Sequence, residues 1–348
     1  MNYSLKKITQ RCLLGVIAVL FFYSCGSDEK KQYYEVTGVA QGTYYRVIYE
    51  DTKMRKPEFD SLLKNFDTTF SVYIPESLIS RINNNDTSLH SIQNWEFSYF
   101  YKKSQYIASI TDSAFDITVA PLVNAWKFGP DTSKHLAPTQ KQIDSIREFV
   151  GMDKISMPND SSFIKSDPRV QIIGNAIAQG YSSDLIAYYL DKLGVENYLV
   201  DVGCEMRSKG VNAKGNVWTI GITRPEEKID EKPLESSFDV AVELNNRSLA
   251  TSGNYRKFYY EDGRKYSHTI NPKTGQTVPS DLLSATVFAT ECIEADAIAT
   301  ACMVMGVEKS KQFFVRHPEY DALLIYDGGD SLQTYSTKGV VVKKIHDK

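Results

Sequence analysis

Residues 291–306, ECIEADAIATACMVMG, set an aspartate and a threonine four positions apart within an apolar helical pattern. Because residues four apart share one face of an α-helix, the Asp296 carboxylate and the Thr300 hydroxyl should point into the same small volume. Both are hard oxygen ligands of the kind that Mg²⁺ uses together with waters and substrate phosphates. The alternative is structural: Asp296 caps a helix that begins later, and Thr300 bonds back to the Asp296 carbonyl.

A second segment offers backbone groups to a ligand. Residues 176–181, AIAQGY, follow Gly174-Asn175 and begin a predicted helix with small side chains. Free N–H groups at a helix start, with close backbone approach, suit a phosphate or an ion bound by a carbonyl. The segment matches neither the GxGxxG fingerprint nor the GK[ST] of a P-loop, so it does not predict either fold.

Two polar loops supply a candidate base and a candidate cation. His268 lies in YSHTINPKTGQTV, residues 266–278, where Asn-Pro and Thr-Gly pairs predict turns. Imidazole has the pKa range of a general base, although a loop histidine is commonly only a solvated side chain. Arg256 lies in LATSGNYRKFY, residues 249–259, which predicts either a turn facing a phosphate or a hairpin loop.

Composition limits the kinds of protein to which the chain can belong. It has 348 residues, 42% hydrophobic and 24% charged, which is ordinary for a globular protein with one large core or two modest ones. The formal net charge of −3 offers no basic face for DNA or RNA, so a nucleic-acid partner is not expected.

The first residues predict export. Three cationic residues precede CLLGVIAVLFFY, an apolar run of about twelve residues that ends at Ser24-Cys25-Gly26. A bilayer core needs about twenty apolar residues, so the run is too short to span it. FYSC is similar to the lipobox of bacterial lipoproteins, which makes residues 1–24 a signal peptide, Cys25 the lipidation site and residues 25–32 a tether. The alternative is an uncleaved anchor helix.

The remaining cysteines do not predict a disulfide or zinc framework. Without the leader and the lipidated residue, Cys204, Cys292 and Cys302 are left to pair, which is an odd number without CxxC spacing. We therefore expect three buried thiols.

The elements that must position these residues mix helices and strands. Helices are predicted over residues 56–70, 95–110, 137–151 (with Thr139 as N-cap and Gly151 as its end), 176–194, 293–307 and 308–317. Strands are predicted over 33–50 (with Gly38 and Gly42 at turns or bulges), 197–210 (as two strands around Gly203), 217–225, 238–244, 282–290, 321–329 and 338–344. Without strict βαβ alternation, this order favours an α+β fold. We treat residues 33–348 as one functional unit, with mixed sheets and helices forming two lobes around a cleft.

Nine of these segments together resemble the ApbE family of flavin transferases. They occur in the family's order and cover nearly all of residues 36–306: QGTYYRV, FSVYIPESLISRIN, AFDITVAPLVNAWKFG, AIAQGYSSD, YLVDVGCEMRSKG, WTIGITRP, LATSGNYRKFY, YSHTINPKTGQ and EADAIAT. The chain departs from the family's usual pattern at Ile173, where an Asp is usual, at Gln179, where a Lys or Glu is usual, and at Cys204, where a second Gly is common.

The resemblance implies an enzyme outside the cytoplasm that uses Mg²⁺ with FAD as its substrate. Such an enzyme moves the FMN moiety of FAD onto a threonine hydroxyl of a partner protein and releases AMP. Acceptors would be membrane redox subunits or extracytoplasmic flavoproteins, which suits an enzyme anchored by lipid to a bacterial membrane and facing the periplasm. The cleft would then hold the flavin and its diphosphate.

Residue by residue, the resemblance also implies a binding site. The metal would be held by Asp296, Thr300 and the backbone oxygen of Ala176, and we expect His268 to act as the base and Arg256 to steady a phosphate. Flavin contacts would fall on Gln41, Tyr73, Ala114, Phe115, Asp116, Gln179 and Ile270. Two alternatives use the same residues: hydrolysis of FAD to FMN and AMP, or flavin binding without catalysis by a lipoprotein.

Overall fold

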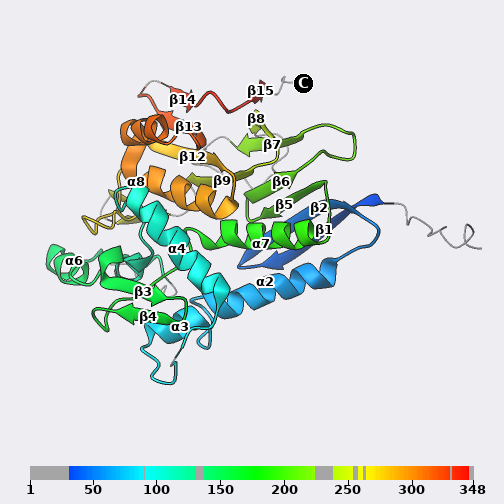
Figure 1. Ribbon diagram of the computed structural model, residues 1–348. Coiled ribbons are helices and arrows are strands. Elements are labelled where there is room, and N and C mark those ends of the chain that lie inside the picture. Colours follow the sequence, from blue (N-terminus) through cyan, green and yellow to red (C-terminus); the bar gives the residue numbers. More distant parts are fainter. Residues whose placement is uncertain are drawn as a thin grey trace, which may run out of the picture.

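An antiparallel sheet of eight strands forms the centre of the protein (Figure 1). The computed structural model of the chain describes residues 31–89, 91–129, 137–223, 238–253, 258–261, 264–329 and 331–344. In spatial order, the strands are β1 (Gln32–Ala40), β2 (Thr43–Asp51), β5 (Tyr198–Val202), β6 (Glu205–Lys209), β9 (Ser248–Gly253), β12 (Leu282–Ala289), β13 (Asp321–Asp327) and β14 (Leu332–Ser336). Each neighbouring pair runs antiparallel.

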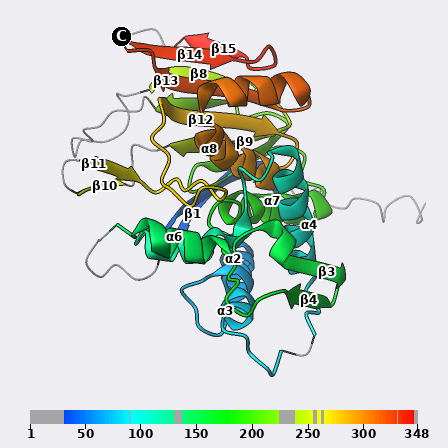
Figure 2. The same ribbon diagram turned by 90° about the vertical axis from the view of Figure 1, so that its left-hand side faces the viewer.

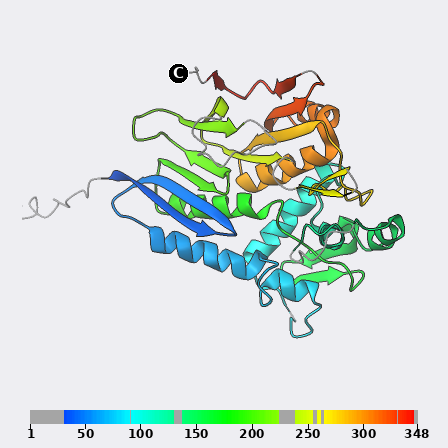
Figure 3. The same ribbon diagram turned by 180° about the vertical axis from the view of Figure 1, so that it is seen from behind.

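Helices cover one face of this sheet and a small sheet covers the other. Helices α7 (Ala178–Lys192) and α8 (Cys292–Arg316) lie side by side across the middle strands, and α2 (Lys56–Phe70) packs beside α7. On the opposite face, apolar side chains of β12 and β13 pack against the three-stranded sheet of β15 (Val342–Lys344), β8 (Phe238–Leu244) and β7 (Trp218–Thr223) (Figure 3). The middle strands of the sheet therefore lie between two layers.

A second lobe, mostly helical, packs beside α7 and α8. It contains α3 (Leu78–Asn83), α4 (Trp95–Ile110), η1 (Ile117–Val119), α5 (Ala120–Ala125), α6 (Gln140–Arg147), η2 (Met152–Lys154) and the hairpin of β3 (Ile155–Asn159) and β4 (Ser162–Lys165). Another hairpin, β10 (Phe258–Glu261) with β11 (Arg264–Ser267), projects to one side of the main sheet (Figure 2). The α+β class with two lobes is confirmed.

Local sequence signals explain several element boundaries. The residues between β1 and β2, Gln41 and Gly42, have φ of 55° and 72°, as a two-residue hairpin turn requires. Gly38 does not mark a turn, so that prediction is wrong: it lies inside β1, and a Cβ there would come 2.3 Å from the Tyr45 ring. Thr139 caps α6 as predicted, with a reciprocal capping box, but the helix ends at Arg147.

The position at which helix α8 begins excludes Asp296 as its N-cap. The helix begins at Cys292, so Asp296 lies in its second turn and is not a cap. Gly306, with φ 75° and ψ 179°, interrupts the helix where the sequence predicts two separate helices.

The cysteines of this helix, Cys292 and Cys302, are buried free thiols as predicted, whereas the free thiol Cys204 is only half-buried. Within the described ranges, no helix has the length and apolar character needed to cross a membrane.

Candidate active site

One cavity brings together residues from both lobes and most of the residues singled out from the sequence. Its volume is about 330 Å³, within the range of small-molecule sites. Residues 114–128 of the helical lobe, the turn before α7, strands β6 and β9, loop 268–272 and α8 all contribute to its wall. Of the predicted site residues, the wall includes Ala114, Phe115, Asp116, Ala176, Gln179, His268, Ile270, Asp296 and Thr300.

Asp296 enters the cavity where α7 and α8 cross. Its Oδ2 accepts a hydrogen bond from the Gly180 backbone N–H at 3.0 Å. The helices can come this close because position 180 has no side chain: a Cβ there would lie 2.4 Å from the Cys292 carbonyl oxygen and 2.7 Å from the Asp296 Cβ. Burial raises the pKa of Asp296 to about 7, and the Gly180 N–H offsets only part of that rise. The carboxylate is therefore costly to ionise without a cation.

The other two predicted ligands lie on the same cavity wall. Because the Gly180 N–H donates to Asp296, it does not bond to Ala176, four residues earlier, and within the described parts of the chain the Ala176 carbonyl accepts no hydrogen bond. The Thr300 hydroxyl lies 3.3 Å from the Ser252 hydroxyl on β9 and does not bond back along its own helix. A carboxylate, a hydroxyl and a free carbonyl are donors that fit a small hard cation.

The Asp, Glu, Lys and Arg residues on the described wall of the cavity are all acidic. Its described wall contains three carboxylates, those of Asp116, Glu205 and Asp296, and no lysine or arginine. Across the described ranges, no three His, Cys, Asp or Glu side chains converge closely enough to hold a metal ion by themselves. A cation here would therefore depend on hydroxyl, carbonyl and substrate oxygens as well as on carboxylates.

Glu205 is a site residue that the sequence analysis missed. It is the first residue of β6 and 6% exposed, and its Oε2 is buried without a hydrogen-bond partner in the described structure. Burial raises the pKa of Glu205 well above its ordinary value, and the charge of Asp296 raises it further. Alternation along a strand predicts that the Glu205 side chain points inward. It does not predict that this position faces the cavity, which depends on the turn before β6.

Asp116 is held mainly by its own turn. Its Oδ1 accepts hydrogen bonds from the backbone N–H and the hydroxyl of Thr118, at 2.7 and 2.6 Å, and so caps η1. Burial raises the pKa of Asp116, and these two bonds lower it in part. Beside it, Phe115 and Ile270 provide buried apolar surface that an aromatic ring system can cover.

His268 lies on the cavity wall in a loop fixed by its neighbours. Its ring centroid is 6.4 Å from that of Phe128, in an edge-on arrangement. Further along the loop, the Gly275 N–H donates to the Asn271 carbonyl at 2.8 Å, and the Trp126 indole N–H donates to the Gly275 carbonyl at 2.8 Å. The loop is therefore anchored to the helical lobe without forming a helix or strand itself.

Two predicted site residues, Gln41 and Tyr73, do not line the described cavity, and two others lie outside the described residues. Gln41 lies near the start of α7, where the Ser182 hydroxyl donates to its Oε1 at 3.4 Å, and its Nε2 is buried without a partner among the described residues. Tyr73 is 65% exposed and does not line the cavity. Arg256 and Cys25 lie outside the described residues. At the Ile173 departure, the side chain is buried and gives the cavity an apolar wall.

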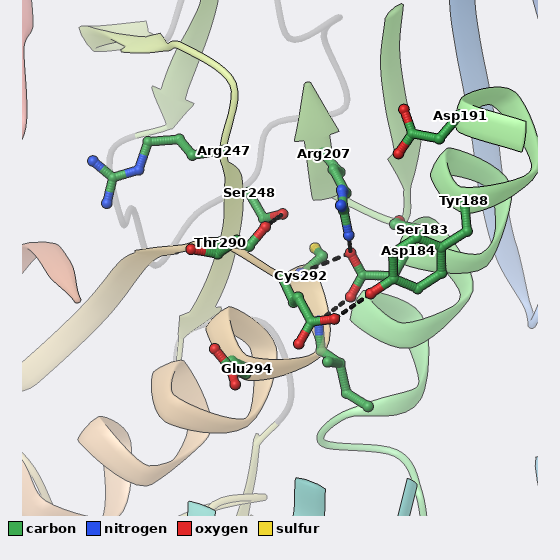
Figure 4. Close-up of polar contacts among 12 residues, drawn as sticks. Ser183, Asp184, Tyr188, Asp191, Arg207, Arg247, Ser248, Thr290, Cys292 and Glu294 are labelled. Atoms are coloured by element: carbon green, nitrogen blue, oxygen red, sulfur yellow. Dashed lines mark hydrogen bonds and ion pairs between the residues drawn. The ribbon is translucent and has the colours of Figure 1, made fainter. Parts of the chain in front are cut away.

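A buried ion pair fixes the start of α8, one turn before Asp296 (Figure 4). The fully buried Asp184 of α7 accepts from the backbone N–H groups of Cys292 and Ile293 at 2.9 and 2.8 Å, and so caps α8 from another helix. Arg207 of β6 donates to the same carboxylate at 2.6 Å. Burial raises the pKa of Asp184 to about 6, with Arg207 offsetting part of the rise, so the group is ionised at neutral pH.

The residue before α8 adds a second layer to this support. Glu291 accepts hydrogen bonds from the hydroxyls of Tyr99 and Tyr188 and pairs with Lys103, which also reaches Glu294 at 2.6 Å. These contacts join α4, α7 and α8, so the two lobes and the Asp296 helix are held in one arrangement.

A larger hollow of about 420 Å³ lies between α3 and the β3–β4 hairpin, away from this cavity. Both of its cationic residues already have partners: Lys165 donates to the backbone carbonyls of Ile82 and Val170 at 3.0 and 2.9 Å, and Arg81 pairs with Asp86 at 2.7 Å. Because the ammonium group satisfies main-chain oxygens, this hollow does not assemble groups for chemistry.

Comparisons with known proteins identify relatives over most of the chain. A family described as the ApbE family matches residues 41–324. The FAD:protein FMN transferase of Escherichia coli (strain K12) is 33% identical over 338 residues, covering 91% of this chain and 93% of that protein. The FAD:protein FMN transferase of Vibrio cholerae serotype O1 is 30% identical over 331 residues, covering 93% and 96%.

Solved structures match the fold over a similar extent. The flavin transferase ApbE from Vibrio cholerae superposes with a TM-score of 0.78 at 30% identity, covering 88% of this chain and 98% of that one. The flavinyl transferase ApbE from Pseudomonas stutzeri, in its apo form, gives a TM-score of 0.77 at 29% identity, covering 89% and 96%.

Proposed function

Because the chain belongs to the ApbE family, we propose that the cavity between its lobes is the active site at which FMN is transferred from FAD to a protein. The family match confirms the resemblance stated from the sequence, and the relatives named FAD:protein FMN transferase support the transferase activity. The finer points, namely the metal, the role of each residue, the acceptor group and the location, are our proposals.

The charge of the cavity is the observation that carries the proposed Mg²⁺ site. FAD brings a negatively charged diphosphate, yet the described wall offers three carboxylates and no lysine or arginine. A divalent cation between the two would convert this repulsion into attraction. Asp296, Thr300 and the free carbonyl of Ala176 are the residues that would hold it. When bound, the cation neutralises phosphate oxygens and stabilises the charge that develops as the diphosphate breaks.

The residues of the chain then orient the reactants and move one proton. The acceptor threonine oxygen attacks the phosphorus of the FMN half, the bond to the bridging oxygen breaks, and AMP leaves. His268 accepts the hydroxyl proton of the threonine, since its loop lies on the wall and imidazole titrates in the needed range. Phe115 and Ile270 cover the flavin ring. Ala114, Asp116 and Gln179, which line the cavity, would bind around it. Gln41, Tyr73 and Arg256 are proposed as contacts from the resemblance alone, since Gln41 and Tyr73 do not line the described cavity and Arg256 lies outside the described residues.

We propose that the enzyme works outside the cytoplasm on a lipid tether. The leader and Cys25 carry this proposal from the sequence alone. Its acceptors would be membrane redox subunits or extracytoplasmic flavoproteins. Changing Cys25→Ser should give protein that is not acylated and that leaves the membrane fraction. Protein that stays in the membrane with its leader attached would favour an uncleaved anchor helix instead.

One incubation tests the proposed reaction. The protein is mixed with FAD, Mg²⁺ and an acceptor domain that carries a target threonine, and the acceptor is examined for flavin fluorescence on a denaturing gel. Fluorescent acceptor with release of AMP is the expected result, and Thr→Val at the target should remove it. AMP without fluorescent acceptor would indicate hydrolysis of FAD, and neither product would indicate flavin binding alone.

A further inference from the structure

Glu205 is placed at the cavity by a strained turn. The two residues before it, Gly203 and Cys204, have φ of 69° and 86°, so the chain reverses sharply between β5 and β6. The backbone oxygen of Glu205 accepts from the Ser183 hydroxyl at 2.7 Å, which ties this position to the first half of α7. Glu205 therefore reaches the cavity from the sheet, and Asp296 and Thr300 reach it from α8.

The carboxylate of Glu205 has an oxygen to spare. Its Oε2 is buried, and no described group donates a hydrogen bond to it. A Cβ built on Gly203 would lie 3.2 Å from this oxygen and 2.9 Å from the Gln179 amide nitrogen, so the glycine leaves the space around both side chains open. An unpartnered buried carboxylate is expensive and points to a partner that the chain itself does not supply.

Nearby acids do not share this property. Asp201 of β5 is also buried, but it accepts from the Cys204 N–H at 2.9 Å and from the Tyr44 hydroxyl at 3.2 Å. One oxygen of Asp116 is taken twice by Thr118. Of the three carboxylates on the described wall, Glu205 is the one with a buried oxygen that no described group contacts.

We propose that Glu205 is a second carboxylate ligand of the divalent cation, facing Asp296 across the same site. The inference rests on the proposed function and adds to its ligand set of Asp296, Thr300 and the Ala176 carbonyl. Two carboxylates balance the charge of one divalent ion, and Mg²⁺ sites that also take substrate phosphates typically use one or two carboxylates. The second carboxylate lets the site hold a cation before FAD arrives, when no phosphate charge is present.

The experiment measures Mn²⁺ binding to the whole protein without FAD, by the loss of the free-ion electron paramagnetic resonance signal. Mn²⁺ prefers the same carboxylate, carbonyl and water oxygens as Mg²⁺. Glu205→Gln keeps the size of the side chain and should weaken Mn²⁺ binding by at least about 10- to 100-fold, the typical loss when a group that only supports a metal ligand is removed. Asp201→Asn is the matched control, since it removes a buried acid that has its own partners, and its binding should equal that of the parent.

The outcomes separate this inference from the proposed function. If the parent binds Mn²⁺, Asp296→Asn does not and Glu205→Gln binds as the parent does, Glu205 is not a ligand although the metal site stands. If the parent itself binds no Mn²⁺, both are overturned. Thermal melting in EDTA accompanies each titration: Glu205→Gln should melt no lower than the parent, because it removes a buried carboxyl group with an oxygen that no described group contacts. The inference is supported if the Glu205→Gln variant melts at the parent's temperature but binds Mn²⁺ less tightly than the parent.

Discussion

Replacing Asp184 with Asn should destabilise the protein more than any surface change of the same kind. The Asp184 side chain is fully buried and that of Arg207 is 15% exposed, with 2.6 Å between their charged atoms. Removing one partner of a buried ion pair costs about 3–5 kcal/mol, because the other charge stays buried and uncompensated. An amide also has one acceptor oxygen, where the carboxylate uses two to cap Cys292 and Ile293. The free energy of unfolding should therefore fall by about 3–5 kcal/mol.

Urea unfolding followed by circular dichroism measures this loss. Asp191→Asn is the control on the same helix: its partner Lys209 also comes from β6, at 3.2 Å, but both side chains are about one-third exposed, so the expected loss is about 0–1 kcal/mol. Adding Arg207→Met to Asp184→Asn should cost little more, since the pair is already broken. If Asp184→Asn costs no more than Asp191→Asn, the ion pair does not fix the start of α8.

Three further predictions concern the cavity. Gly180→Ala should lower the melting temperature and weaken Mn²⁺ binding, because its Cβ would lie 2.4 Å from the Cys292 carbonyl oxygen; Gly174→Ala, with nothing nearer than 3.5 Å, should melt close to the parent. His268→Ala should slow transfer by about 10²- to 10⁴-fold while FAD affinity, from fluorescence quenching, changes little; loss of both would make His268 a binding residue. Because burial raises the pKa of Asp296 from 3.8 to about 7, the metal-free protein should lose stability as pH rises through this range. Asp296→Asn should escape this loss and, in EDTA at pH 8, exceed the parent's free energy of unfolding by up to about 4 kcal/mol; a less stable variant would contradict the cost of the buried charge.

Sequence periodicity predicted the long elements and missed the short ones. The helices at 56–70 and 95–110 match the observed α2 and α4 because each carries several turns of amphipathic pattern. The β3–β4 and β10–β11 hairpins, with strands of four or five residues, were not predicted, since so few residues show no period. Gly38 was misread because the reason for its missing side chain, the Tyr45 ring, comes from the neighbouring strand.

The candidate site was predictable where helical spacing alone brings groups together. Asp296 and Thr300 lie on one cavity wall, as a separation of four residues implies. Glu205 and Asp184 were missed because their roles depend on tertiary packing: Asp184 caps a helix 108 residues further along the chain. Sequence spacing carries no signal for such a contact.

The Mg²⁺ dependence of flavin transfer, compared between the parent and Asp296→Asn, tests the central claim most directly. Acceptor-bound flavin and released AMP are measured in the same reactions over a series of Mg²⁺ concentrations. The parent should form both products in equal amounts, with no reaction in EDTA and saturation as Mg²⁺ rises, while the folded Asp296→Asn protein should form neither at any concentration. Transfer by Asp296→Asn at the parent's rate, or by the parent in EDTA, would contradict a metal-dependent active site at this cavity.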